Sequence, residues 1–152
     1  MRIVDLLNKE SILLNASPAS KQEAIDMLVV LQVYGGWIAD KEAYKKGILA
    51  REEMSSTAVG EGIAIPHAKT AAVKAPGLAA MVIKDGVDFD SLDDEPVNLL
   101  FLIAAPNTED NIHLDVLSKL SMLLMDENFV EKLKNASSVD EFLEIVDAAD
   151  EE

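Results

Sequence analysis

Uninterrupted runs of apolar residues recur along the chain and are separated by segments with helical spacing. The runs fall within residues 11–15, 63–65, 78–83 and 97–104, and they are bounded by polar residues, Gly or Pro. A short continuous apolar run between turn residues is typical of a strand that is buried on both faces. We therefore expect strands at these positions, in the interior of the fold.

Capping residues predict where helices begin between these runs. Ser20 with Glu23 and Ser138 with Glu141 form capping boxes, and Asp40 can cap a further helix. Helices are expected at about 21–35, 41–50, 111–124, 129–133 and from 139 onward. Strands that alternate with helices predict an α/β fold, and here a three-layer α/β/α sandwich with a mixed β-sheet.

The charge of the chain narrows the classes of partner. Its 152 residues include 28 acidic and 13 basic side chains, which give a formal net charge of −15. Such a molecule repels nucleic acids and anionic membranes, so neither is expected as a partner. Much of the excess lies at 85–95 and 147–152, and acidic clusters of this kind are usually solvated faces or tails.

Length and hydropathy suit a single cytoplasmic domain. A chain of 152 residues can bury one core, so we expect one domain over 1–152 with an acidic tail at about 147–152. No apolar run approaches the roughly 20 residues of a membrane span, and the first residues lack the apolar segment of a signal peptide. The absence of cysteine excludes a disulfide framework, a thiolate metal site and a cysteine nucleophile.

Residues 60–69 (GEGIAIPHAK) place one of the two histidines of the chain directly after a short apolar run. Pro66 fixes its own φ and favours an extended Ile65, so the side chain of His67 is held in one direction. A neutral imidazole can act as a nucleophile near neutral pH without a separate base. An isolated histidine after a proline is also often a turn or core residue, so this spacing alone leaves both roles open.

The sequence offers less support for nucleotide binding, serine hydrolysis or metal binding. A dinucleotide-binding GxGxxG motif would need glycine where Ile65 stands, and the Lys-Ser/Thr pair of a GxxxxGK[ST] P-loop is absent. The serines of the 52–61 segment, which we expect to be a loop, lack the GxSxG turn of a serine hydrolase. His67 and His113 have no third ligand at a typical metal-site spacing. We therefore expect no metal and no cofactor.

Residues 51–69 (REEMSSTAVGEGIAIPHAK) resemble the signature of enzyme IIA domains of the bacterial phosphoenolpyruvate-dependent phosphotransferase system. The resemblance is to the fructose, mannitol and nitrogen class of these domains. It implies that His67 is phosphorylated on Nε2 and that His113 is the second histidine of the catalytic site. It further implies that Arg51 also acts in catalysis, and that Arg51, Thr57 and His113 bind the phosphoryl group.

Each of these supporting residues also has a structural role open to it. Arg51 can interact with the dipole at a helix C-terminus, Thr57 can be a loop residue, and His113 can begin a helix. The chemistry is nevertheless suitable, because a guanidinium donates two parallel hydrogen bonds to phosphate and a helix N-terminus offers free N–H groups. Ser55 and Ala58 stand where many relatives have glycine, which implies a similar loop with less conformational freedom.

The resemblance also implies a function as a phosphocarrier. His67 would accept a phosphoryl group from the small carrier HPr and pass it to a cysteine of a IIB domain, outside this cysteine-free chain. A membrane IIC component would then take up the sugar, with a fructose-type sugar favoured. Two alternatives stay open: a regulatory phosphocarrier of the nitrogen type, and a module that binds partners without accepting phosphate.

Overall fold

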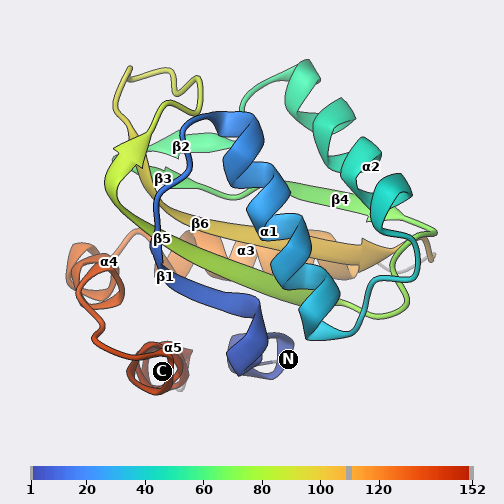
Figure 1. The fold of residues 1–152 in the computed structure, drawn as a ribbon. Coiled ribbons are helices and arrows are strands. Elements are labelled where there is room, and N and C mark those ends of the chain that lie inside the picture. Colours follow the sequence, from blue (N-terminus) through green and yellow to red (C-terminus); the bar gives the residue numbers. More distant parts are fainter. Residues whose placement is uncertain (1, 109–110, 151–152) are drawn as a thin grey trace.

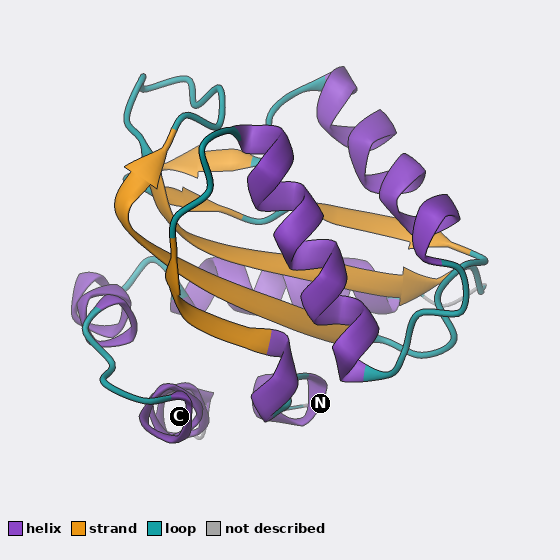
Figure 2. Cartoon of the chain, viewed as in Figure 1, coloured by secondary structure: helices purple, strands orange, loops and turns teal. Residues whose placement is uncertain are grey.

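The chain forms a mixed β-sheet between two layers of helices (Figures 1 and 2). The computed structural model describes residues 2–108 and 111–150, and the sheet in this part of the chain has six strands. These are β1 (Ile12–Ala16), β2 (Ala58–Gly60), β3 (Ile63–Ala64), β4 (His67–Thr70), β5 (Gly77–Val87) and β6 (Val97–Pro106). Their order is β1-β5-β6-β3-β2, and β4 also pairs with β6. The predicted α/β fold with a mixed sheet is confirmed.

The two long strands β5 and β6 form the centre of the core. They pair antiparallel, with Ala80 opposite Phe101. Leu100 packs in the cluster beneath the first two helices, whereas its neighbours Leu99 and Phe101 pack beneath the last three, and all are fully buried. Because helices cover both faces of the central part of these strands, polar residues are disfavoured there, which explains the continuous apolar runs in the sequence.

Five helices in the described residues make the outer layers. On one face lie α1 (Lys21–Gly35) and α2 (Lys41–Met54), and on the other lie α3 (Ile112–Leu123), α4 (Glu127–Lys134) and α5 (Val139–Asp150) (Figure 1). Two short 3-10 helices, η1 (Ile3–Leu6) and η2 (Lys9–Ser11), precede β1. The predicted caps are present, since the side chains of Ser20, Asp40 and Ser138 each accept a hydrogen bond from a backbone amide three residues later. None of the helices in the described ranges is both long and apolar enough to cross a bilayer.

The predicted element bounds are wrong around the histidine motif. Helix α2 continues to Met54 instead of ending near residue 50, and β2 lies inside the segment expected to be a loop. Strand β4, which begins at His67, was not expected. Strand β4 exists because the distant β6 pairs with it, whereas β2 pairs with β3, its neighbour across a tight turn. Their own sequences carry no clear period of alternation.

The acidic end of the chain was expected to be a solvated tail, but up to Asp150 it is bound to other parts of the fold. Asp147 accepts a hydrogen bond from Arg2, and Asp150 accepts one from the amide of Ile3 at 2.6 Å. Asp150 also pairs with Lys119 at 2.5 Å, and its side chain is inaccessible to solvent. These carboxylates therefore join the N-terminal segment to α5 and α3. The last two residues of the expected tail, 151 and 152, lie outside the described residues.

The environment of Asp150 favours its charged form. Burial alone would raise its pKa, but the hydrogen bonds from Lys119 and the Ile3 amide, with the charges of Lys119 and Arg2, outweigh this and lower the pKa. A carboxyl group with a lower pKa in the folded chain stabilises the fold above the pKa that it has in the unfolded chain. That contribution is lost as the pH falls through the folded-state pKa.

We predict that Asp150→Asn lowers the free energy of unfolding by about 1–2 kcal/mol near neutral pH, because it removes charge-assisted hydrogen bonds. The difference from the unmodified chain should shrink toward about pH 3, where the carboxyl group is increasingly protonated. Urea unfolding at both pH values measures this. Glu144→Gln, an exposed substitution on the same helix, is the control and should change little. An equal loss for Asp150→Asn at both pH values would contradict the assignment.

Candidate functional site

A tight turn between β2 and β3 leads into the segment that carries His67. Gly60, Glu61 and Gly62 have φ values of 93°, 56° and 81°, a left-handed conformation that glycine adopts at little cost. The carboxylate of Asp93 accepts a hydrogen bond from the Glu61 amide at 2.9 Å and so holds the non-glycine residue of the turn. The two glycines and this acid therefore determine how the chain enters β3.

His67 is the first residue of β4, and the sheet fixes its backbone. Strand β4 pairs in parallel with β6, with His67 opposite Ile103. The amide of Ile103 donates to the carbonyl of Pro66 at 2.9 Å. The histidine thus begins a strand on the central β6, whereas the sequence predicted only that it follows one.

One ring nitrogen of His67 is already engaged. Nδ1 lies 2.9 Å from the carbonyl oxygen of Ile65. A carbonyl oxygen can only accept a hydrogen bond, so Nδ1 carries the proton and Nε2 of the neutral ring keeps its lone pair. No described residue forms a hydrogen bond with Nε2. The nitrogen that the sequence resemblance implies as the phosphorylated one is therefore the nucleophilic nitrogen of the ring.

A pocket of about 260 Å³ lies beside this ring, and its lining suits an anion. It is lined by Arg51, Ser56, Thr57, Ala58, Val59, Ile65, His67, Leu117 and Ser121. A guanidinium and hydroxyl groups are donors that phosphate oxygens accept. In the described part of the chain, no group of three His, Asp or Glu side chains is placed to hold a metal ion. The structure thus brings Arg51, Thr57 and His67 to one pocket.

Arg51 lies in the last turn of α2. Its Nη1 donates to the carbonyl of Ser55 at 2.9 Å and lies 3.5 Å from the Ser55 hydroxyl oxygen. Ser55 is the residue at which the helix ends, so Arg51 does interact with the helix C-terminus. Both of these contacts use Nη1, and the guanidinium carries further donors. Both roles considered from the sequence are therefore compatible with its position.

Thr57 is buried in the wall of the pocket. Its hydroxyl group donates to a carboxylate oxygen of Glu52, and its amide donates to the other oxygen at 3.2 Å. The hydroxyl proton that was expected to reach phosphate is thus given to Glu52 in this structure. A hydrogen bond from Thr57 to phosphate would require that interaction to break.

His113 lies in the first turn of α3, near His67 but outside the lining of the pocket. Leu117 and Ser121, which do line it, follow at four-residue spacing on the same face of the helix. Burial lowers the pKa of His113, and the charges of Lys69 and His67 lower it further, against an opposing effect of Asp115. The lowered pKa favours the neutral form of the His113 imidazole. Its buried Nδ1 has no hydrogen-bond partner in the described residues.

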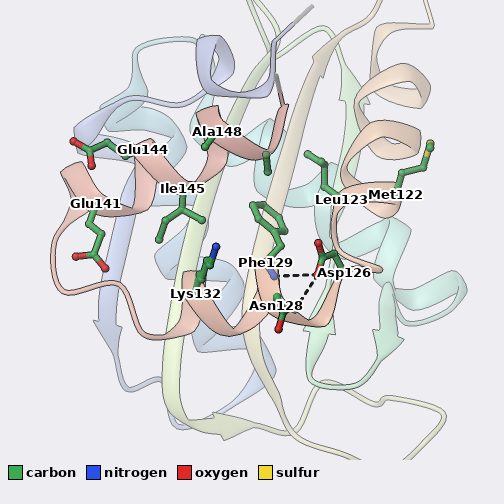
Figure 3. Close-up of a pocket in the computed structure, with 11 residues that line it drawn as sticks. Met122, Leu123, Asp126, Asn128, Phe129, Lys132, Glu141, Glu144, Ile145 and Ala148 are labelled. Carbon is green, nitrogen blue, oxygen red and sulfur yellow. Dashed lines mark hydrogen bonds between the residues drawn. The ribbon is translucent and has the colours of Figure 1, made fainter. Parts of the chain in front are cut away.

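A larger pocket of about 560 Å³ lies elsewhere, between the end of α3, α4 and α5. Figure 3 shows lining residues on two helices, with Phe129 and Lys132 on α4 and Glu141 and Ile145 on α5. None of the residues predicted for the phosphoryl site lines it. The residues of the smaller pocket, and not its size, identify the candidate site.

Glu52, a buried carboxylate next to Arg51 along the chain, is not among the site residues predicted from the sequence. Helical spacing could have found it. Tyr44, Ile48 and Glu52 recur every four residues and are the buried residues of α2. A charged residue on the apolar face of a helix requires a partner, and the sequence does not indicate which residue provides it.

A comparison with protein families matches residues 5–149 to the family described as "Phosphoenolpyruvate-dependent sugar phosphotransferase system, EIIA 2". The chain is 47% identical over 150 residues to the fructose-specific EIIABC component of Bacillus subtilis (strain 168), a match that covers 99% of this chain and 24% of that protein. It is 45% identical over 129 residues to the fructose-specific EIIA component of Haloferax volcanii, with 85% of this chain and 84% of that protein covered. The chain thus spans about a quarter of the Bacillus protein and most of the Haloferax protein.

The fold also matches a solved structure closely. The crystal structure of nitrogen regulatory protein IIA-Ntr from Neisseria meningitidis superposes with a TM-score of 0.86 at 30% identity. The match covers 95% of this chain and 98% of that one. The chain is therefore similar both to proteins named for fructose and to one named for nitrogen regulation.

We predict that the neutral ring of His67 carries its proton on Nδ1. Nitrogen-15 NMR should show a protonated Nδ1 and an unprotonated Nε2 in the neutral ring. Because the chain has two histidines, His113→Ala and His67→Ala assign the signals. A ring protonated mainly on Nε2 would contradict the hydrogen bond to Ile65.

Proposed function

The chain belongs to the EIIA 2 family of the phosphoenolpyruvate-dependent sugar phosphotransferase system, and from this premise we propose that His67 relays a phosphoryl group from phospho-HPr to a IIB domain. Members of this family are phosphotransferases that carry a phosphohistidine in the relay. The observation that carries the proposal is the free Nε2 of His67 beside a pocket that contains a guanidinium. The relay would operate in the cytoplasm, where we expect the chain.

The first transfer is a displacement at phosphorus. The lone pair of His67 Nε2 forms the new N–P bond while the N–P bond to the donor histidine of HPr breaks, and the donor ring keeps that electron pair. The proton on Nδ1 stays in its hydrogen bond to Ile65. This bond becomes stronger as the phosphorylated ring gains positive charge, because charge-assisted hydrogen bonds are stronger than neutral ones.

The second transfer reverses the role of His67. A cysteine thiolate of the IIB domain attacks the phosphorus, and the N–P bond of His67 breaks. The chain has no cysteine, so the acceptor must lie in another domain or protein. The name of the Bacillus relative, an EIIABC component, supports a IIB partner and a membrane IIC component further along the route.

The charges around the pocket affect how tightly the phosphoryl group is bound. A phosphoryl group adds roughly −1.5 to −2 charges to a chain that already carries a formal −15. Arg51 can offset part of that charge with paired hydrogen bonds, and a neutral His113 adds a donor without a second fixed charge. Modest compensation suits a relay, because tight binding of the phosphorylated state would slow the onward transfer.

A fructose-type sugar is the favoured final acceptor. The two fructose-specific relatives share 47% and 45% identity with the chain, against 30% for the nitrogen regulatory structure. The close fold match with that structure keeps the nitrogen-type regulatory role as the second candidate. With IIB and IIC partners added, a fructose-type carrier phosphorylates sugar, whereas a regulatory carrier accepts phosphate and leaves the sugar unmodified.

We predict that phosphoenolpyruvate, enzyme I and HPr together add one acid-labile phosphoryl group to the chain. Mass spectrometry should detect the gain in the unmodified protein and in His113→Ala, and should find none in His67→Ala, which lacks the acceptor nitrogen. If His67→Ala still gains the group, His67 is not the acceptor. If the unmodified chain binds HPr but gains nothing, it is a binding module only.

For Arg51→Ala we predict transfer from phospho-HPr that is about 100-fold slower, because a donor to the transferring group is lost. Arg51→Lys should restore part of the rate, since it keeps the charge but not the paired donors. Rapid-quench measurement of the phosphorylated fraction gives the rates, and circular dichroism checks the fold. An unchanged rate in Arg51→Ala would remove this residue from the site.

A further inference from the structure

Glu52 is a buried charge that the relay chemistry does not use. Only 4% of its side chain is exposed. It follows Arg51 along α2, but its carboxylate lies on the buried face of the helix, with Tyr44 and Ile48. Burial of a carboxylate is costly unless hydrogen bonds and an opposite charge compensate for it.

Both oxygens of this carboxylate are used. Oε1 pairs with Nζ of Lys21 at 3.0 Å and accepts the amide of Thr57 at 3.2 Å, and Oε2 accepts the hydroxyl of Thr57. Lys21 is itself only 19% exposed and lies 4.7 Å from the ring centroid of Phe89. The Glu52 carboxylate thus links Lys21, at the start of α1, to Thr57, which lines the pocket beside His67.

The interaction continues from Thr57 to the reactive ring. The carbonyl of Thr57 accepts the amide of Ile65 at 3.1 Å. The carbonyl of Ile65 in turn accepts Nδ1 of His67 at 2.9 Å. An unbroken series of polar contacts therefore runs from Lys21 through Glu52, Thr57 and Ile65 to the nitrogen opposite the one that would accept phosphate.

We infer that Glu52, held by Lys21, is a positioning residue that fixes the ring of His67 through Thr57 and Ile65. The effect on transfer rests on the proposed relay, whereas the effect on the ring does not. A carboxylate can fix the orientation of Thr57, because one of its oxygens accepts the Thr57 amide and the other accepts the Thr57 hydroxyl. Buried ion pairs contribute little net stability compared with apolar residues, so a geometric role explains why a charge occupies this face.

The same two helices provide a matched control. Lys45 of α2 and Asp26 of α1 form an ion pair at 2.7 Å, with 28% and 42% of their side chains exposed. Neither residue takes part in the contacts that lead to His67. α1 and α2 lie side by side over the sheet, so both pairs bridge the same interface (Figure 1).

The test compares Glu52→Gln with Asp26→Asn. Glu52→Gln replaces one carboxylate oxygen with an amide NH2 group, which cannot accept a hydrogen bond from Thr57 or Lys21. We expect the maximal rate of transfer from phospho-HPr to fall by about 10- to 100-fold, with the half-saturating HPr concentration little changed, because the reacting ring is misaligned. Asp26→Asn should leave the rate within about twofold, as expected for a substitution outside the series of contacts.

A second readout needs no phosphate. In unphosphorylated Glu52→Gln, ring nitrogen-15 shifts should show His67 with its proton shared between Nδ1 and Nε2, and the Ile65 amide should exchange faster with solvent. If the unmodified chain accepts no phosphate, the proposed relay is wrong, and these signals alone decide the inference. Unchanged ring signals, or equal changes in Asp26→Asn, would overturn it.

A second pair of variants tests the inference independently of whether Glu52→Gln folds. Lys21→Arg keeps the ion pair and should retain the transfer rate within about threefold, whereas Lys21→Met should lose rate as Glu52→Gln does. Equal rates for Lys21→Arg and Lys21→Met, both matching the unmodified chain, would show that Lys21 does not hold Glu52 for this purpose.

Discussion

Strand β6 is the constraint on which the rest of the structure depends. One of its edges bonds to β5 and the other bonds first to β3 and then to β4. The strand is buried on both faces, so its backbone groups must find partners within the sheet. A change of register would leave amides unpaired and turn the side chains of β4 to the opposite face. The position of His67 opposite Ile103 is therefore set by the core.

The site forms at the edge strand β4, where the two helical layers meet. Arg51 comes from α2 on one face of the sheet, and Leu117 and Ser121 come from α3 on the other. The 55–62 segment connects α2 to β3 and contributes Ser56, Thr57, Ala58 and Val59 to the lining of the pocket. The Glu52 contacts hold that segment from within, and Asp93 holds its end from outside.

Part of the negative charge of the chain is compensated by contacts away from the pocket. Asp147 and Asp150, near the C-terminal end, are bound to Arg2 and Lys119, and Asp93 is bound to the turn before β3. Near His67 the neighbours are a guanidinium, the charge of Lys69 and a neutral imidazole. A protein that repels anions overall can therefore still accept a phosphoryl group at one place, because local charges at short range outweigh distant screened ones.

The sequence by itself determined the layered α/β fold and the family, because apolar runs, capping residues and the 51–69 motif are local patterns. It gave Arg51 and His67 as candidates but could not decide between structural and chemical roles for them. Only the tertiary structure decided that β2 and β4 are strands, that Thr57 gives its hydroxyl proton to Glu52, and that Nδ1 of His67 is engaged by Ile65. The pairing of β4 with β6 and of Lys21 with Glu52 joins residues far apart in sequence, and it arises from the packing of helices on the sheet. The contacts of Thr57 and His67 are local in sequence, but they depend on side-chain directions that the fold sets.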